Sequence, residues 1–265
     1  MTTNTVFYIF LGIIVGILLG SFTNVLVSRG PRAWGLTIGG GKPTGLAYPE
    51  SQCESCGHKI RAHDLIPVLS WLILRGRCRD CGAAIGWRHL AVEVLGGLIV
   101  LACMLRFGLG PHLGFAAFWL FGLLALAFID AETGYLPDAI TFPLMAGGVV
   151  AAGLGYGPPL VEALIGGAVG GGTFYIIAKG YRVLRGQEGL GGGDVKLIAA
   201  AGLWSGVWAL PFLILVASVG GLLAAATAML AGKGEMRLQQ EIRFGPFLTA
   251  AAAGVYLLPL PFAGI

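Results

Sequence analysis

The sequence contains eight apolar runs, each close to the length that a helix needs to cross a membrane. Crossing about 30 Å of hydrocarbon takes roughly 20 helical residues. The runs lie near residues 6–27, 89–107, 113–130, 139–156, 160–181, 194–208, 210–231 and 246–262. Of the 265 residues 56% are hydrophobic and only 11% are charged, and the mean hydropathy is +0.83. Because soluble globular proteins lie well outside this range, we predict an all-α polytopic membrane protein with about eight transmembrane helices.

The positions of the basic residues predict how these helices are oriented. Eight spans place both termini on one side of the membrane, and every Lys and Arg except Arg106 then lies on the other side or at its boundary. Lys and Arg are enriched in cytoplasmic segments, so we expect both termini to face outward. The net charge of +4 then reflects topology and contact with anionic lipid. We therefore expect membrane lipid as a partner and no nucleic acid.

Four of the five cysteines form two C-x2-C pairs, CESC and CRDC, that are separated by 21 residues. This spacing is typical of a tetrathiolate zinc site, and a redox-active pair is the alternative. Each pair is followed by glycine, which suits the tight turn of a zinc knuckle. Because four thiolates leave no open coordination position, we expect the zinc to be structural. The predicted ligands are Cys53, Cys56, Cys78 and Cys81.

The cysteine pairs lie in the one long polar segment, which predicts the domain organisation. Residues 1–28 form the first transmembrane helix and residues 29–88 a small zinc-ribbon-like cytoplasmic domain, inserted between the first and second helices. Residues 89–265 then form the transmembrane core. Structural disulfides are not expected in the segment 29–88, because the cytoplasm keeps thiols reduced.

Two carboxylates at predicted helix ends are candidates for an active site, since ionisable groups at the membrane are costly. Asp130 ends its helix, where the helix dipole disfavours a negative charge, so capping does not explain it. Asp194 follows glycines 191–193 and opens a helix, a position that suits capping as well as catalysis. Both lie at cytoplasmic ends of their helices and can face each other. We interpret Asp138, after Pro137, as the N-cap of the next helix.

Two facing carboxylates cannot both ionise cheaply, so one is expected to hold a proton and act as general acid while the other acts as general base. This is the chemistry of aspartic proteases. Glycines 191–193 would bring the backbone of Asp194 close to Asp130 and leave room for an extended peptide. A proton-coupled transporter that uses the same pair is an alternative. A non-catalytic scaffold that docks partners through the zinc domain is another, and it leaves Asp130 unexplained.

Five blocks of the sequence carry a resemblance that covers nearly the whole chain. They are LGSFTNVLVSRGPR (19–32), the cysteine segment (53–82), IDAETGYLPDAITFP (129–143), GLGGGDVKLIAAAGLW (189–204) and IRFGPFLTA (242–250). In this order they resemble the type IV prepilin peptidases, or leader peptidase/N-methyltransferases, a family of membrane aspartic proteases with a G-x-G-D motif. The resemblance implies that Asp130 and Asp194 are the catalytic pair.

The resemblance also implies a substrate and a second activity. Family members act in the bacterial inner membrane on prepilins and pseudopilins of type IV pilus and type II secretion systems. They cut a short basic leader after glycine at the cytoplasmic face, and many then methylate the new N-terminus with S-adenosylmethionine. The residues that bind this donor stay unassigned. The chain has His89-Leu90 where members commonly have Tyr-Pro and Leu65 where many have Asn, departures that bear on methylation more than on proteolysis.

Overall fold

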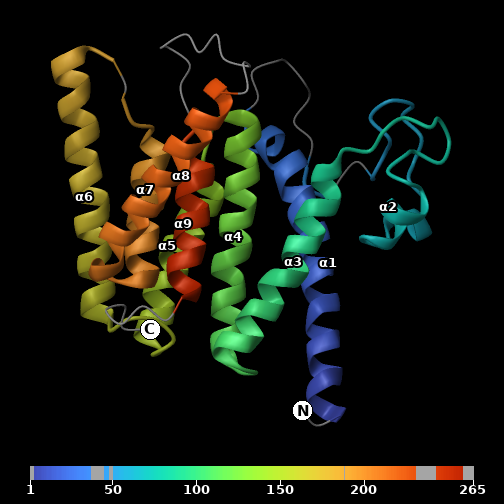
Figure 1. Cartoon of the computed structure of the whole chain (residues 1–265), viewed down its shortest axis with the longest axis horizontal. Coiled ribbons are helices and arrows are strands. Elements are labelled where there is room, and N and C mark those ends of the chain that lie inside the picture. The colour runs from blue at the N-terminus through green and yellow to red at the C-terminus, as the bar shows by residue number, and fades with distance from the viewer. Residues whose placement is uncertain (1–2, 37–44, 48–49, 188, 231–242, 259–265) are drawn as a thin grey trace. The chain divides into compact units, whose positions relative to one another are not determined.

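The computed structural model describes residues 3–36, 45–47, 50–187, 189–230 and 243–258, and these are mostly helical (Figure 1). Within them, β pairing is limited to two isolated bridges, which confirms the prediction of an all-α fold. The chain divides into two compact units, Met1–Ala117 and Phe118–Ile265. Each unit is built around close contacts between helices.

The first unit is built on a pair of long helices, α1 (Thr3–Ala33) and α3 (Trp87–Phe107). They approach closely because glycines meet at the crossing: a methyl group on Gly96 would lie 2.9 Å from Cα of Gly20. Small residues at a crossing allow this approach in lipid. The side-chain amide of Asn24 also donates to the carbonyl of His89 at 2.9 Å. The chain between the two helices holds the cysteines and two short helices, η1 (Ala62–Leu65) and α2 (Leu69–Ile73).

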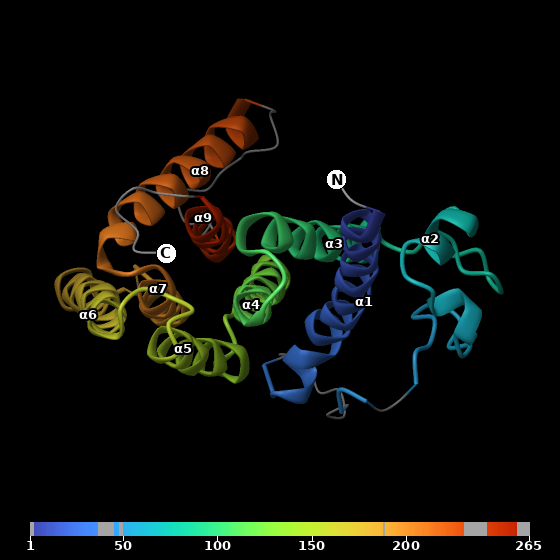
Figure 2. The same cartoon turned by 90° about the horizontal axis from the view of Figure 1, so that it is seen from below.

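The second unit packs around one short central helix. It contains the greater part of α4 (Pro111–Thr133) and the helices α5 (Asp138–Gly153), α6 (Leu160–Arg185), α7 (Gly192–Ser205), η2 (Val207–Ala209), α8 (Leu210–Leu230) and α9 (Gly245–Leu257). Helix α7 packs against α5, α6 and α9, and Figure 2 shows it between α5 and α6. Every residue from Leu197 to Ser205 is buried. A helix that is apolar on all sides is suited to such a position.

The predicted count of eight transmembrane helices is not confirmed. All eight predicted runs contain a helix, although residues 231 and 259–262 at the ends of the last two lie outside the described residues. Among the described residues, five helices are long and apolar enough to cross a membrane, judged by length and composition: Val6–Ala33, α3, α4, α6 and Val207–Thr227. Helices α5, α7 and α9 have 16, 14 and 13 residues. At 1.5 Å per residue a 14-residue helix reaches only about 21 Å, short of the roughly 30 Å of hydrocarbon.

Helices α6 and α7 touch through their backbones at Gly166 and Gly202. A methyl group on Gly166 would lie 2.9 Å from the amide nitrogen of Val207 and closer still to the carbonyl oxygen of Gly202. A methyl group on Gly202 would lie 2.9 Å from the amide nitrogen of Gly167. Because these neighbours are backbone atoms that cannot move aside, only glycine fits on both sides of the crossing. This contact fixes α7 in the centre of the unit.

We expect Gly166→Ala and Gly202→Ala each to lower the free energy of unfolding by about 1–3 kcal/mol, because the added methyl group has no space at the crossing. The change is measured as a lower thermal midpoint of the purified protein in detergent. Gly172→Ala, in the same helix α6, is the control, since no atom lies within 4 Å of its added methyl group. Equal midpoints in all three variants would show that the crossing is not tightly packed.

Candidate active site and metal centre

The four predicted zinc ligands come together in the first unit. Their sulfur atoms all lie within 4.8 Å of one another, and the Sγ atoms of Cys53 and Cys81 are 3.8 Å apart. Four sulfurs placed tetrahedrally at about 2.3 Å from zinc are about 3.8 Å apart, whereas bonded disulfide sulfurs are about 2.0 Å apart. All five cysteines are free thiols. The cluster therefore has the donor set and spacing of a tetrathiolate zinc site.

Each cysteine pair folds into the same tight turn. The backbone amide of the first cysteine donates to the carbonyl of the fifth residue after it, at 2.9 Å in one pair and 2.8 Å in the other. Gly57 and Gly82 have φ angles of +73° and +71°, which glycine adopts far more readily than other residues. The role predicted for the two CG sequences is confirmed. Hydrogen bonds from the backbone amides of Cys56 and Ser55 lower the pKa of Cys53 to about 6, which favours the thiolate that binds metal.

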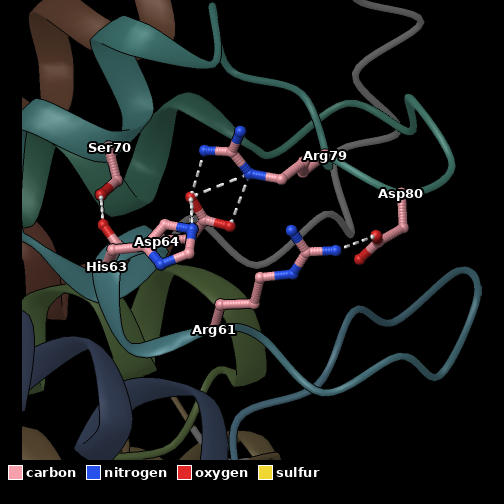
Figure 3. Close-up of polar contacts among 6 residues, drawn as sticks. All are labelled: Arg61, His63, Asp64, Ser70, Arg79 and Asp80. Carbon is pink, nitrogen blue, oxygen red and sulfur yellow. Dashed lines mark hydrogen bonds and ion pairs between the residues drawn. The ribbon is translucent and has the colours of Figure 1, made fainter.

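Ion pairs tie the second cysteine pair to η1, as Figure 3 shows. The two residues between Cys78 and Cys81 are Arg79 and Asp80, and both form ion pairs. Arg79 binds both carboxylate oxygens of Asp64, with its shortest contact at 2.6 Å from Nη2 to Oδ1. Arg61 donates to Asp80 at 3.3 Å. The second cysteine pair and the chain at η1 therefore each supply one positive and one negative side chain to these two ion pairs. The ion pairs fix the orientation of the cysteine turn relative to η1.

Asp64 is the most enclosed member of this network. Its side chain is only 8% exposed, and the hydrogen bond from Arg79 lowers the pKa of Asp64 below its ordinary value of 3.8. The carboxylate therefore stays charged at every pH at which cysteines can bind zinc. The next helix is attached as well, because Oγ of Ser70 in α2 donates to the carbonyl of His63 at 2.9 Å.

The second unit places Asp130 and Asp194 close together. Asp130 lies in the last turn of α4 and is 6% exposed. Asp194 lies in the first turn of α7 and is partly buried. The carboxylate of Asp130 is near enough to act electrostatically on that of Asp194. The structure thus brings the two carboxylates singled out in the sequence within electrostatic range of each other.

The start of α9 covers Asp130. A methyl group on Gly245 would lie 2.5 Å from Oδ2 of Asp130, so only glycine fits against the carboxylate here. Arg243 donates to the carbonyl of Ala131 and so caps the end of α4. Within the described part of the chain, Oδ2 of Asp130 is buried without a hydrogen-bond partner. The backbone amide of Gly245 also interacts with the carboxylate of Asp130, so the start of α9 encloses this group.

Asp194 is not the N-cap residue of its helix. The N-cap of α7 is Gly191, which makes no side-chain cap bond, and Asp194 is the third residue of the helix. Its carboxylate turns back to interact with the backbone amide of Gly191, as the third residue of a capping box does. A methyl group on Gly193 would lie 2.8 Å from Cβ of Leu136. This glycine therefore allows the start of α7 to approach the loop between α4 and α5.

The interpretation of Asp138 as an N-cap is wrong. Helix α5 begins at Asp138, its N-cap is Pro137, and no side-chain cap bond is formed. The carboxylate of Asp138 instead pairs with Nζ of Lys196 in α7, at 2.6 Å. No local pattern predicts this pair, because the two residues are 58 positions apart. Sequence reasoning gave Lys196 no role, although its position two residues after Asp194 was an available signal.

Comparison with known families and proteins matches almost the whole chain. The model of the bacterial peptidase A24 N-terminal domain matches residues 14–107, and that of the type IV leader peptidase family matches residues 116–226. The prepilin leader peptidase/N-methyltransferase of Burkholderia pseudomallei (strain K96243) is 39% identical, over 94% of this chain and 85% of that protein. The proteins of the same name from Dickeya chrysanthemi and Neisseria gonorrhoeae are 39% and 37% identical, each over 91% of this chain and over 89% and 87% of their own lengths. No solved structure matches the chain.

These matches cover both the cysteine cluster and the aspartate pair. The first family model contains the four cysteines and the second contains Asp130 and Asp194. The relatives are well above 30% identical and are aligned over most of their length. The chain belongs to the type IV leader peptidase family.

Proposed function

We propose that this protein is a membrane aspartic endopeptidase of the bacterial inner membrane that removes the short basic leader of prepilins or pseudopilins. The observation that carries the proposal is the pair of neighbouring carboxylates, Asp130 and Asp194, in a chain of this family. Relatives at 37–39% identity are named prepilin leader peptidase/N-methyltransferase. Asp130 and Asp194 are the proposed catalytic residues.

Peptide hydrolysis by this pair needs one proton shared between the two carboxyl groups. The ionised carboxylate takes a proton from water as the water oxygen attacks the scissile carbonyl carbon, and the protonated carboxyl group gives its proton to the carbonyl oxygen. The tetrahedral intermediate then breaks its C–N bond as the carboxyl group protonates the leaving nitrogen, and the ionised carboxylate takes a proton from a hydroxyl group of the intermediate, which becomes the product carboxyl group. One water molecule is consumed, and the pair returns to its starting state with one proton.

The surroundings of the pair suit an extended peptide. Gly191 and Gly192 are exposed beside Asp194, and no atom lies within 4 Å of the position that a methyl group on Gly192 would take. A peptide backbone can approach there without meeting a side chain. A prepilin has a basic leader followed by a hydrophobic helix. That helix can stay in the bilayer while the leader junction reaches the two aspartates at the membrane boundary.

The proposal includes a topology and a division of the chain. Residues 1–28 anchor the chain, residues 29–88 form a cytoplasmic zinc-binding domain, and residues 89–265 form the protease core, with both termini outside and lipid around the helices. The excess of Lys and Arg in the segments assigned to the cytoplasm supports this orientation. Because the metal cluster has four thiolate ligands, its zinc would hold the fold of residues 53–82 and take no direct part in hydrolysis.

A second activity, methylation of the new N-terminus, is proposed because the relatives are named as N-methyltransferases. S-adenosylmethionine supplies the methyl group in such a transfer. The free amine produced by cleavage is the acceptor, so the two reactions follow each other on one substrate. The transporter alternative finds no support among the family models or relatives.

We expect Asp130→Asn and Asp194→Asn each to lower the rate of leader cleavage by roughly 10²–10⁴-fold, because one proton-transfer group is lost. The measurement is cleavage of a purified prepilin in detergent, followed by gel mobility. Glu132→Gln changes a neighbouring exposed carboxylate on α4 and should keep the wild-type rate. Wild-type cleavage by either aspartate variant would rule out the proposed pair.

Cys53→Ser with Cys81→Ser should remove about one zinc per chain and unfold residues 53–82, because zinc binding and folding of such a segment are coupled. Metal content is measured by mass spectrometry and local unfolding by limited proteolysis. Cys103→Ser is the control, since this buried cysteine lies in α3, outside the cluster. A double variant that still holds one zinc per chain would contradict a site made of all four thiolates.

Mass spectrometry of the processed substrate tests the methylation. With S-adenosylmethionine present, we expect the mature N-terminus to gain a single methyl group, and without the donor we expect the same cleavage product unmodified. A product that stays unmodified with the donor present would limit the protein to proteolysis.

A further inference from the structure

Lys196 links the start of α7 to the start of α5. Its Nζ lies 2.6 Å from Oδ1 of Asp138 and 5.3 Å from the centre of the Phe142 ring. Asp138 and Phe142 are four residues apart in α5 and so lie on the same face of that helix. The lysine side chain is therefore held by a charge and by an aromatic ring on one surface of α5.

The position of Lys196 relative to Asp194 gives this contact its importance. Residues two apart in a helix are separated by about 200° and point to nearly opposite sides. When Lys196 is held against α5, Asp194 must point away from α5. The carboxylate of Asp194 interacts electrostatically with that of Asp130. The rotation of the first turns of α7 thus decides whether the two aspartates meet.

Other contacts between α5 and α7 lie farther from the site. Nε1 of Trp204 donates to the carbonyl of Leu144 at 2.7 Å, and a methyl group on Gly148 would lie 3.0 Å from Cβ of Leu203. Leu203 and Trp204 are in the last turn of α7, whereas Asp194 is in the first. These buried contacts hold the far end of α7 against α5. Nearer its start, α7 meets α5 through Lys196, meets the preceding loop through Gly193, and meets α6 where a methyl group on Gly171 would lie 2.9 Å from Cβ of Ala199.

We infer that the Lys196–Asp138 pair is a positioning device that sets the rotation of α7 and so aims Asp194 at Asp130. The inference rests on the proposed function, in which these aspartates are the catalytic pair. Lys196 and Asp138 are positioning residues, since each acts through the placement of Asp194.

The exposure of the pair separates this role from a role in stability. The side chains of Lys196 and Asp138 are 38% and 53% exposed, and exposed ion pairs contribute little to the free energy of folding. A small misplacement of a catalytic group, by contrast, can cost about 10²-fold in rate. Loss of the pair should therefore lower kcat strongly and leave the thermal midpoint almost unchanged.

The test compares Lys196→Met, Asp138→Asn and the exchanged double variant Asp138→Lys with Lys196→Asp. Each single variant should lower kcat for prepilin cleavage by roughly 10- to 100-fold with KM nearly unchanged. The exchanged variant restores an ion pair of the same length with reversed charges and should recover most of the lost kcat. Hydrogen–deuterium exchange of residues 192–198 should be faster in the single variants and return to the wild-type rate in the exchanged one.

Lys179→Met is the matched control, because Lys179 also lies over an aromatic ring, Tyr175 at 5.8 Å, but in α6. It should behave as the wild type. Wild-type kcat and exchange in Lys196→Met would overturn the inference, as would an exchanged variant that stays as slow as the single variants. If the thermal midpoint fell together with kcat, the pair would be a stabilising contact only, and this result would also overturn the inference.

The proposed function fails on a different result, cleavage by Asp194→Asn at the wild-type rate. The exchange rates of residues 192–198 need no substrate. They therefore decide whether Lys196 and Asp138 fix the start of α7 even if the substrate is not a prepilin.

Discussion

The packing of the second unit depends on keeping two carboxylates together at the edge of an apolar bundle. Burying a charged carboxylate costs free energy, and Asp130 is 6% exposed at a helix end where the dipole is unfavourable. Three glycine contacts make this arrangement possible: Gly245 against Asp130, Gly193 against Leu136, and Gly202 against Gly166. Each brings a backbone closer than any side chain would allow. These three glycines therefore allow close approach of the backbone, whereas Gly192, beside Asp194, has no atom within 4 Å of the position of an added methyl group.

Hydropathy predicted where the helices lie but not how many cross the membrane. Runs of apolar residues mark the helices because lipid and protein interior both favour them, so a buried helix and a spanning helix look alike in sequence. Helix α7 shows the difficulty: its residues from Leu197 to Ser205 are buried by neighbouring helices and not by lipid. Its end is set by Gly206, which has a φ of +78°. The hydropathy of the sequence did not reveal this helix end, because η2 and α8 continue the apolar run beyond Gly206.

That Asp130 and Asp194 lie near each other was predictable, because it requires only that successive helices run in alternating directions. Successive helices α4, α5, α6 and α7 run up and down, so the end of α4 and the start of α7 come to the same end of the unit (Figure 1). This holds whether or not every helix crosses the bilayer. The partners of Asp138 and Asp64 were not predictable in the same way. Their contacts with Lys196 and Arg79 depend on the tertiary fold. Local sequence rules instead favour helix capping or a solvated surface for Asp138 and Asp64.

The two structural units correspond to the two family models, and each unit contains one of the two candidate sites. One model falls wholly within Met1–Ala117 and the other begins at residue 116, at the boundary of the second unit. The first unit holds a cluster of four cysteines, and four thiolates around one zinc would leave no coordination position for a substrate. The second holds two carboxylates, of which one has a buried oxygen atom without a partner among the described residues. We therefore propose that hydrolysis takes place in the second unit. The ion pairs of Arg79 and Asp80 with η1 indicate that the zinc cluster serves to shape the polar segment around it.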